Sequence, residues 1–491
     1  MKQINRRSFL QSTLLTTAAT TLMPLPRSWA QVAGANDTIR VAVVGFGGRG
    51  GNHIDAFSTM SGVRVVALCD ADQRILDAGA KRLADKGNPV KAYLDVRKLL
   101  EDKEVDAIAT ATPNHWHSLL VVWACQAGKD VYVEKPVSHN VWEGRQAVAA
   151  ARKYNRIVQA GTQGRSNEGL REALDWVRAG NLGKIKVARG LCYKRRASIG
   201  KVSGPQPIPE GIDYDLWCGP ALKLALMRQR LHYDWHWVWN TGNGDIGNQG
   251  IHQMDVARWA LGKGELSPRI LSVGGRFGYI DDGETPNTQF AIHDYGDALL
   301  IFEVRGLPSG APEPTAAQET GQKVREEMDK YRGQSIGHVI ECENGYLTGT
   351  TVYDNDGKEI RKFNARGEND HFANFIKAMR SRNVADLKSD ILEGHLSSAL
   401  CHTSNISYRL GQKADPGSIK QALEAHPAGL ETFERFQAHL ARHKIDLNLD
   451  KAALGAFLEM DPATERFRGN DAANALLTRP YRAPFIVPEI V

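Results

Sequence analysis

Short apolar runs alternate with amphipathic stretches through the first third of the chain. The apolar runs have the length of buried strands, and the stretches 119–127 and 141–154 repeat apolar residues at helical spacing. This alternation is typical of βαβ units and predicts a Rossmann-type, doubly wound parallel sheet over residues 37–163. Its predicted strands are 39–44, 63–69, 105–111, 130–134 and 157–160.

The pattern changes after Gly164. Alternating apolar and polar positions at 185–193 and 270–277 are separated by segments rich in Gly, Pro and Trp. This predicts a second, α+β domain over 164–425 with a largely antiparallel open sheet. The bias of residues 306–327 towards Pro, Gly, Ala and Glu indicates a long excursion within that domain.

Residues 426–491 form a predicted C-terminal extension. Helical spacing is found at 430–443 and 452–457, and a Pro-containing tail follows from residue 479. Because the tail is too apolar for a freely solvated end, we expect it to pack on the body.

The first 30 residues differ from the rest of the chain. Arg6 and Arg7 precede a weakly apolar, Thr-rich run that ends near Ala30 and contains no acidic residue. This pattern is typical of a twin-arginine export signal and predicts a periplasmic or otherwise exported protein.

Charge and cysteine usage exclude several classes. The formal net charge of +6 falls to +2 once the four basic residues of the first segment are removed. A nearly balanced chain argues against nucleic-acid binding, and no later run approaches the roughly 20 apolar residues of a membrane span. The six cysteines form no C-x-x-C pair, so we expect neither a metal site nor a disulfide framework.

A glycine-rich loop follows the first predicted strand directly. Its spacing is G-x-G-x-x-G, and its residues are Gly45, Phe46, Gly47, Gly48, Arg49 and Gly50. Such glycines admit a pyrophosphate to the backbone, and the next helix offers free N–H donors. Asp70, at the end of the next strand, can bind an adenosine ribose and repel a 2′-phosphate, which favours NAD over NADP. The alternative for Asp70 is a cap on the following helix. NADP also stays possible, because Arg74 could tolerate a 2′-phosphate.

Two further motifs stand at the ends of the predicted strands 105–111 and 130–134: Thr112-Pro113-Asn114-His115-Trp116-His117 and Glu134-Lys135-Pro136. With the glycine loop they make residues 37–425 resemble the glucose-fructose oxidoreductase and inositol dehydrogenase family (Gfo/Idh/MocA), in its twin-arginine branch. The resemblance implies an NAD(P)-dependent enzyme, commonly a homo-oligomer. It places Lys135 near nicotinamide and substrate, and it puts a second set of residues around the cofactor: Thr112, Asn114, His117, Glu134 and Gln163. The alternative for Lys135 is a surface cation paired with Glu134.

The second domain contains a candidate catalytic motif. Asn248, His252 and Asp255 share one helix face if the helix begins near Asn248. The family motif usually has an aspartate where this chain has Asn248, and its histidine maps onto His252 as acid/base. Because an amide cannot accept a proton, any relay runs through His252, Lys135 or a nearby acid such as Asp245 or Asp255. The alternative for His252 is a packed core histidine.

Aromatic and basic residues suggest a carbohydrate substrate. Three tryptophans lie within 235–239, and sugar faces stack on such rings, although aromatic clusters also build cores. The segment 193–196 could present cations to an anionic group or form a solvated face. The candidate substrate contacts are Tyr193, Trp235 and Asp245.

These features favour hydride transfer from a secondary hydroxyl of a sugar, cyclic polyol or glycoside, with a tightly bound cofactor. A redox-neutral NAD-dependent glycosidase, which oxidises C3 and eliminates across C2, is the second hypothesis. Its base could be His252, Asp245, Tyr193 or Tyr233. A non-catalytic cofactor- and ligand-binding protein is the third.

Overall fold

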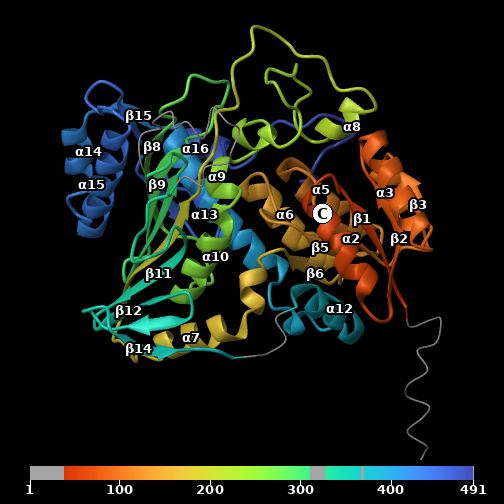
Figure 1. Ribbon diagram of the computed structural model, residues 1–491, viewed down its shortest axis with the longest axis horizontal. Helices are drawn as coiled ribbons and strands as arrows, with labels where there is room; N and C mark the ends of the chain where they lie inside the picture. Colours follow the sequence, from red (N-terminus) through yellow and green to blue (C-terminus); the bar gives the residue numbers. More distant parts are fainter. Residues whose placement is uncertain (1–37, 310–326, 366–369, 490–491) are drawn as a thin grey trace, which may run out of the picture.

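The computed structural model describes residues 38–309, 327–365 and 370–489. The predicted export signal and most of the predicted excursion at 306–327 lie outside the described residues. Two domains stand side by side, each built on one sheet (Figure 1).

The first sheet is parallel, with strand order β3-β2-β1-β4-β5-β6, which confirms the predicted Rossmann-type fold. Its strands are β1 (Ile39–Val44), β2 (Val63–Cys69), β3 (Lys91–Tyr93), β4 (Ala107–Thr110), β5 (Asp130–Val133) and β6 (Val158–Ala160). Its helices are α2 (Arg49–Thr59), α3 (Gln73–Asp85), α4 (Val96–Leu100), α5 (Asn114–Gln126) and α6 (Val141–Lys153). Strand order reverses between β1 and β4, and ligands of such sheets bind at this switch point.

Two elements of the first domain differ from the sequence expectation. Strand β3 was not expected, because two of its three residues are exposed and it lacks an apolar pattern. Helix α12 (His371–Ser381) returns from much later in the chain and packs Phe375, Ile376 and Met379 against the core of this sheet.

The second sheet is mixed and largely antiparallel, also as predicted; of its central pairings, β7 with β10 is parallel. Its order is β14-β13-β12-β11-β7-β10-β9-β8-β16-β15, and β17 pairs with β8 and β18. The strands are β7 (Ile185–Tyr193), β8 (Arg269–Gly275), β9 (Thr288–Asp294), β10 (Leu299–Arg305), β11 (Ile336–Cys342), β12 (Gly345–Thr348), β13 (Thr351–Tyr353), β14 (Glu359–Lys362), β15 (Gln412–Ala414), β16 (Ala452–Leu454), β17 (Leu458–Asp461) and β18 (Arg466–Phe467).

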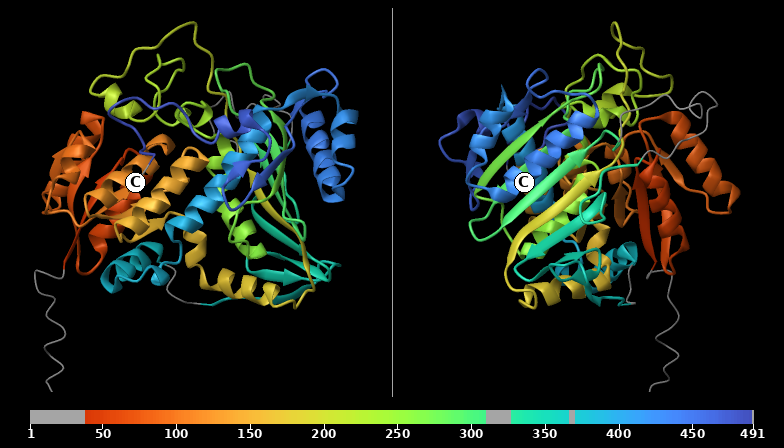
Figure 2. Two further views of the ribbon diagram at one scale, coloured as in Figure 1. Left: turned by 180° about the vertical axis from the view of Figure 1, so that it is seen from behind. Right: turned by 60° about the vertical axis from the view of Figure 1, so that its left-hand side comes forward.

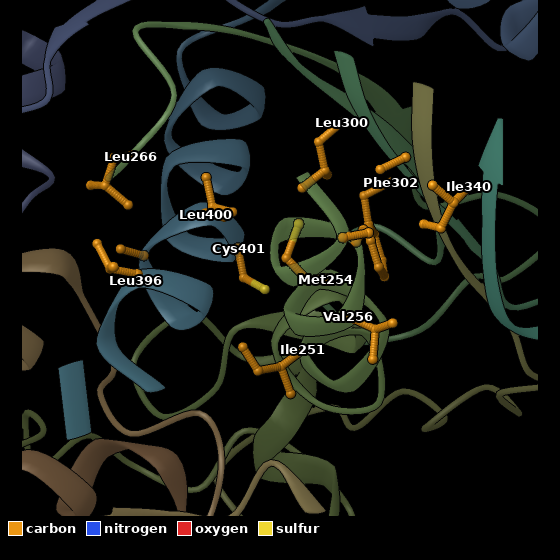
Figure 3. Packing of buried hydrophobic residues seen from close by; sticks show 14 of the residues in the cluster. Ile251, Met254, Val256, Leu266, Leu300, Phe302, Ile340, Leu396, Leu400 and Cys401 are labelled. Carbon is orange, nitrogen blue, oxygen red and sulfur yellow. The ribbon is translucent and has the colours of Figure 1, made fainter. Parts of the chain in front are cut away.

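Helices cover both faces of this sheet. Met254 of α10 (Gly250–Leu261) and Leu400 of α13 (Ile391–Arg409) pack with Phe302 of β10 on the face towards the first domain (Figure 3). The neighbouring Ile301 points the other way, into a cluster with α14 (Pro416–Ala422) and α15 (Pro427–Arg442). The remaining α-helices of the described residues are α7 (Glu168–Arg178), α8 (Tyr214–Cys218), α9 (Gly244–Gly247) and α16 (Asp471–Ala475).

The segment 452–457 is not the helix that its apolar spacing suggested. Residues 452–454 form β16, where Ala453 pairs with Gly274 of β8. A run this short does not distinguish helix from strand, and the open sheet edge decides it.

All six cysteines are buried and unpaired. No helix in the described ranges is long and apolar enough to cross a membrane.

Candidate functional site

A cavity of about 480 Å³ lies at the switch point of the first sheet. The first domain lines it with the glycine loop, Asp70, Thr112 and Lys135, among others. The second domain closes it with residues of the segment 200–248: Leu216, Trp217, His232, Tyr233, Trp235, His236 and Asn248. This segment reaches the first domain, where Asp213 N–H donates to the Ala71 carbonyl at 2.9 Å.

The glycine loop has the form of a dinucleotide cradle. Gly45 has a φ of +73°, and a Cβ there would lie 2.8 Å from the backbone nitrogen of Thr112. A Cβ on Gly50 would lie 2.1 Å from the Gly45 carbonyl oxygen, and one on Gly47 would lie 2.9 Å from Ile75 Cδ1. Only glycine fits these close approaches of strand, turn and helix. Gly48 has open space around its Cα, and the Phe46 ring packs in the core rather than in the cavity wall.

Asp70 is held by the backbone with its carboxylate at the cavity. It accepts from Phe46 N–H and Asp72 N–H, both at 3.1 Å, and burial raises its pKa. The helix cap proposed for Asp70 belongs to Asp72, which caps α3. Arg74 forms an ion pair with Asp72 at 2.8 Å and is not among the cavity-lining side chains, so the structure does not place it to receive a 2′-phosphate.

Glu134 lines the cavity, as does Arg49, and is the centre of a polar cluster at its wall. Its carboxylate accepts from Arg49 Nε at 2.9 Å and Gln163 Nε2 at 3.2 Å, and it contacts His53 Nε2 at 3.1 Å. Burial would raise its pKa, but His53 and the nearby cations hold the pKa below its usual range. Gln163 thus orients Glu134 rather than lining the cavity, and His53, which no motif indicated, has the same role.

Lys135 follows β5 and lines the cavity. Its ammonium donates to the Asn248 carbonyl at 3.0 Å, across the gap between the domains. Within the described ranges, no carboxylate lies within 4 Å of this ammonium, so the proposed surface pair with Glu134 is absent. Burial lowers the pKa of Lys135, a shift that Glu134 opposes.

His252, in the first turn of α10, interacts with Lys135. Burial lowers its pKa to about 3, and the charge of Lys135 adds to the effect. The imidazole is therefore neutral near pH 7. It is not among the side chains that line the cavity, so the structure does not place the predicted acid/base against a bound hydroxyl.

The expected helix face of Asn248, His252 and Asp255 is not formed. Helix α10 begins at Gly250, and Asn248 ends the short α9, so Asn248 contributes its backbone carbonyl to Lys135. The Asp255 carboxylate points into the interior, where it accepts from Arg165 at 2.9 Å and Ser397 at 2.7 Å. This ion pair gives Asp255 a structural role in the second domain.

The expected substrate contacts separate into two groups. Trp235 lines the cavity, and Asp245 lies behind it in a bidentate pair with Arg196. Tyr193 points to the opposite face of the sheet, where its hydroxyl donates to Glu303 at 2.6 Å. Side chains alternate along β7, and Tyr193 stands on the face covered by α15, so it does not contact the site.

The Thr112–His117 loop lines the cavity and connects the domains. Asn114 Nδ2 donates to Asn243 Oδ1 at 3.1 Å. Buried His117 contacts the carbonyls of Thr112, at 2.8 Å, and Pro136, which ties this loop to the one that carries Lys135.

The sequence does not single out His236 as a functional residue, because the tryptophans around it indicate a stacking surface instead. It lines the cavity, stacks on Trp235 with ring centroids 3.6 Å apart, and contacts the Tyr233 carbonyl through Nδ1. Burial lowers its pKa to about 3. A neutral ring that donates through Nδ1 leaves Nε2 as a proton acceptor.

Comparison with known sequences identifies both domains. Residues 39–162 match the Gfo/Idh/MocA family, described as an oxidoreductase family with an NAD-binding Rossmann fold, and residues 176–283 match its C-terminal α/β domain. The chain belongs to the Gfo/Idh/MocA oxidoreductase family. The predicted NAD-binding domain is thereby confirmed.

Curated relatives of this Gfo/Idh/MocA chain include proteins named glycosyl hydrolase family 109. The one from Shewanella baltica is 29% identical over 174 residues, and the one from Shewanella pealeana is 30% identical over 171. Each match covers 31% of this chain and 38% of the relative, so well under half of either length is shared.

Solved structures share the fold at low identity. The WlbA dehydrogenase from Bordetella pertussis, solved with NADH and UDP-GlcNAcA, has a TM-score of 0.53 at 19% identity, covering 75% of this chain and 96% of that one. A levoglucosan dehydrogenase solved with NADH has a TM-score of 0.53 at 14% identity, covering 75% and 97%.

Proposed function

We propose that the protein is an NAD-dependent oxidoreductase that oxidises a secondary hydroxyl of a sugar, cyclic polyol or glycoside. The observation that supports this most is the placement of Lys135. Its ammonium projects into the dinucleotide cavity, is held by a neutral carbonyl, and has neutral His252 beside it. A cation without a carboxylate partner is available for proton exchange.

The residues divide the chemistry between them. Bound NAD supplies a nicotinamide ring as the oxidant. Lys135, once deprotonated, accepts the proton of the substrate hydroxyl, and the lowered pKa brings the free amine closer to the working pH. Neutral His252 places no second positive charge beside Lys135, while Trp235 offers a stacking surface to the sugar ring. The Asp245 carboxylate accepts two hydrogen bonds from Arg196 behind the cavity.

A panel of hexoses, methyl glycosides and cyclic polyols tests this proposal. We expect at least one compound to generate the absorbance of NADH in the NAD-loaded protein. Binding of such compounds without chemical change in either partner would instead support a ligand-binding protein.

A glycosidase is the second candidate, favoured by the names of the curated relatives and by His236. Elimination after oxidation at C3 needs a base for the C2 proton. Tyr193 faces away and Asp245 is paired with Arg196, which leaves His236 and Tyr233 among the cavity-lining residues. Release of a reducing sugar with solvent deuterium at C2 and no net NADH would identify this reaction.

Asp70→Ser tests the choice of cofactor. Loss of the carboxylate removes charge-assisted hydrogen bonds to the ribose and the repulsion of a 2′-phosphate, so the NAD-to-NADP preference should fall by about 10- to 100-fold. Titration of each cofactor by tryptophan quenching measures this. Asp77→Ser on the exposed side of α3 is the matched control and should leave both affinities unchanged. Equal preferences in wild type and Asp70→Ser would refute the ribose role.

We further propose export by the twin-arginine route, supported by Arg6 and Arg7 and by the small residues near Ala30. Outside the cytoplasm NAD is scarce, which makes a retained cofactor part of this proposal. Fractionation of cells expressing an Arg6→Lys/Arg7→Lys variant should find the protein retained inside. Unchanged export of this variant would contradict the proposal.

A further inference from the structure

The C-terminal tail crosses from the second domain back to the first. After α16 it runs along the segment around α8 and ends on the helices of the first domain (Figure 2). Its Phe485 and Val487 are each 1% exposed and belong to the core of the first sheet. The tail is therefore packed into the fold, and it contacts segments of both domains outside the cavity.

One wall of the cavity is an interdomain contact centred on Trp116. Its indole Nε1 donates to the carbonyls of Leu216 at 3.0 Å and Trp217 at 3.1 Å, and all three residues line the cavity. A Cβ on Gly219 would lie 2.2 Å from the Trp116 ring, so the two segments are closely packed. With Leu94 and Val96, this wall forms the apolar part of the cavity that continues from Asp70. Because Asp70 marks the ribose, we assign this part to the adenine.

The tail holds this wall from outside. Arg482 donates to the Asp215 carboxylate at 2.8 Å and to the carbonyls of Asp215 and Ala221, on either side of Leu216 and Trp217. Phe485 packs edge-on against Trp116, with ring centroids 5.5 Å apart.

Arg479 adds a second link. It donates to the His115 carbonyl in the first domain and to the Asn240 carbonyl in the second, both at 3.1 Å. It also pairs with the fully buried Glu143 at 2.9 Å.

We propose that residues 479–487 are a clasp that retains the dinucleotide. Opening the wall far enough to release the adenosine requires Trp116 to separate from Leu216 and Trp217, and the clasp bonds both sides. Arg482 and Phe485 are thus positioning residues for cofactor binding that do not line the cavity. The proposal rests on NAD binding and not on the reaction assigned above.

Arg482→Met is the informative variant. Its partner Asp215 is 45% exposed and also pairs with Lys223 at 3.1 Å, so no buried charge is left unpaired. Arg468→Met, in the same extension and 67% exposed, is the matched control. NADH is bound to each purified protein, and its dissociation is followed by fluorescence after addition of excess NAD, without any substrate.

We expect NADH to leave Arg482→Met about tenfold faster than wild type, the effect of one or two lost hydrogen bonds, with Arg468→Met unchanged. A chain ending at Thr478 should release NADH faster still. Mass spectrometry of the purified truncated protein should find less retained NAD than in wild type. Wild-type dissociation rates in folded Arg482→Met would overturn the clasp. If the truncated chain does not fold, Phe485→Leu replaces it, and an unchanged rate there would also count against the proposal. Because no turnover is measured, failure of the proposed reaction leaves this result unaffected.

Discussion

Lys135→Met should lower kcat by about 10²- to 10⁴-fold, the contribution typical of a positioned general acid or base. Methionine keeps the length and apolar character of the side chain but removes the group that exchanges protons. The Asn248 carbonyl loses its ammonium donor, while the glycine loop and Asp70 are untouched. NADH binding should therefore stay within a few-fold of wild type.

The pH profile supplies a second readout for Lys135. In the direction of oxidation the amine must be neutral to accept a proton, so kcat/KM should fall as the pH drops below its pKa. Burial lowers that pKa from the usual 10.4, which moves the acid limb of the profile towards neutral pH. His252 and His236, with pKa values of about 3, should not titrate in this range. The limb should be absent from the residual activity of Lys135→Met.

Lys129 offers the matched control. It lies at the other end of β5, is 5% exposed, and its ammonium is also held by backbone carbonyls, those of Asp102 and Val105. Lys129→Met should lower the melting temperature but keep the turnover of the folded protein. Equal turnover in Lys135→Met and wild type would remove Lys135 from the mechanism.

Gly50→Ala should abolish NAD binding. The added methyl group would lie 2.1 Å from the Gly45 carbonyl, a backbone atom that cannot move without displacing the turn. The turn and the start of α2 form the expected pyrophosphate site, so any shift removes the N–H groups from the ligand. We expect an affinity loss of at least about 100-fold, which corresponds to two missing charge-assisted hydrogen bonds.

Gly51→Ala is the neighbouring control. It lies in the same helix, a Cβ there meets no atom within 4 Å, and alanine is the better helix former. Calorimetric titration with NAD should find this variant unchanged, with equal or higher thermal stability. If Gly50→Ala binds NAD as wild type does, the loop is not the cradle described here.

Much of the first domain could be predicted because its signals are local. The glycine loop, Asp70 and Lys135 each directly follow a strand that the apolar pattern marks, and parallel strands bring their carboxyl ends to one edge. Strand β3 could not be predicted, because it is short and exposed and its residues have no apolar pattern. It forms because the neighbouring strand β2 pairs with it.

The second domain was harder for physical reasons. Alternation along β7 showed that Tyr193 and its neighbours face opposite sides, but it could not tell which side meets the site. The break between α9 and α10 lies at Asn248, whose backbone has φ of −85° and ψ of −84°. The residue type at this position does not predict that conformation. The burial of Asp255 depends on Arg165 and Ser397, which are distant in sequence.

The most direct test is a single-turnover experiment with the NAD-loaded protein and the best substrate of the panel, deuterated at the carbon to be oxidised. The cofactor is extracted after acid quench and analysed by mass spectrometry. The account predicts that deuterium appears on the nicotinamide in wild type. In Lys135→Met it should appear about 10²- to 10⁴-fold more slowly. Complete conversion of the substrate with no deuterium on the nicotinamide at any time would contradict it.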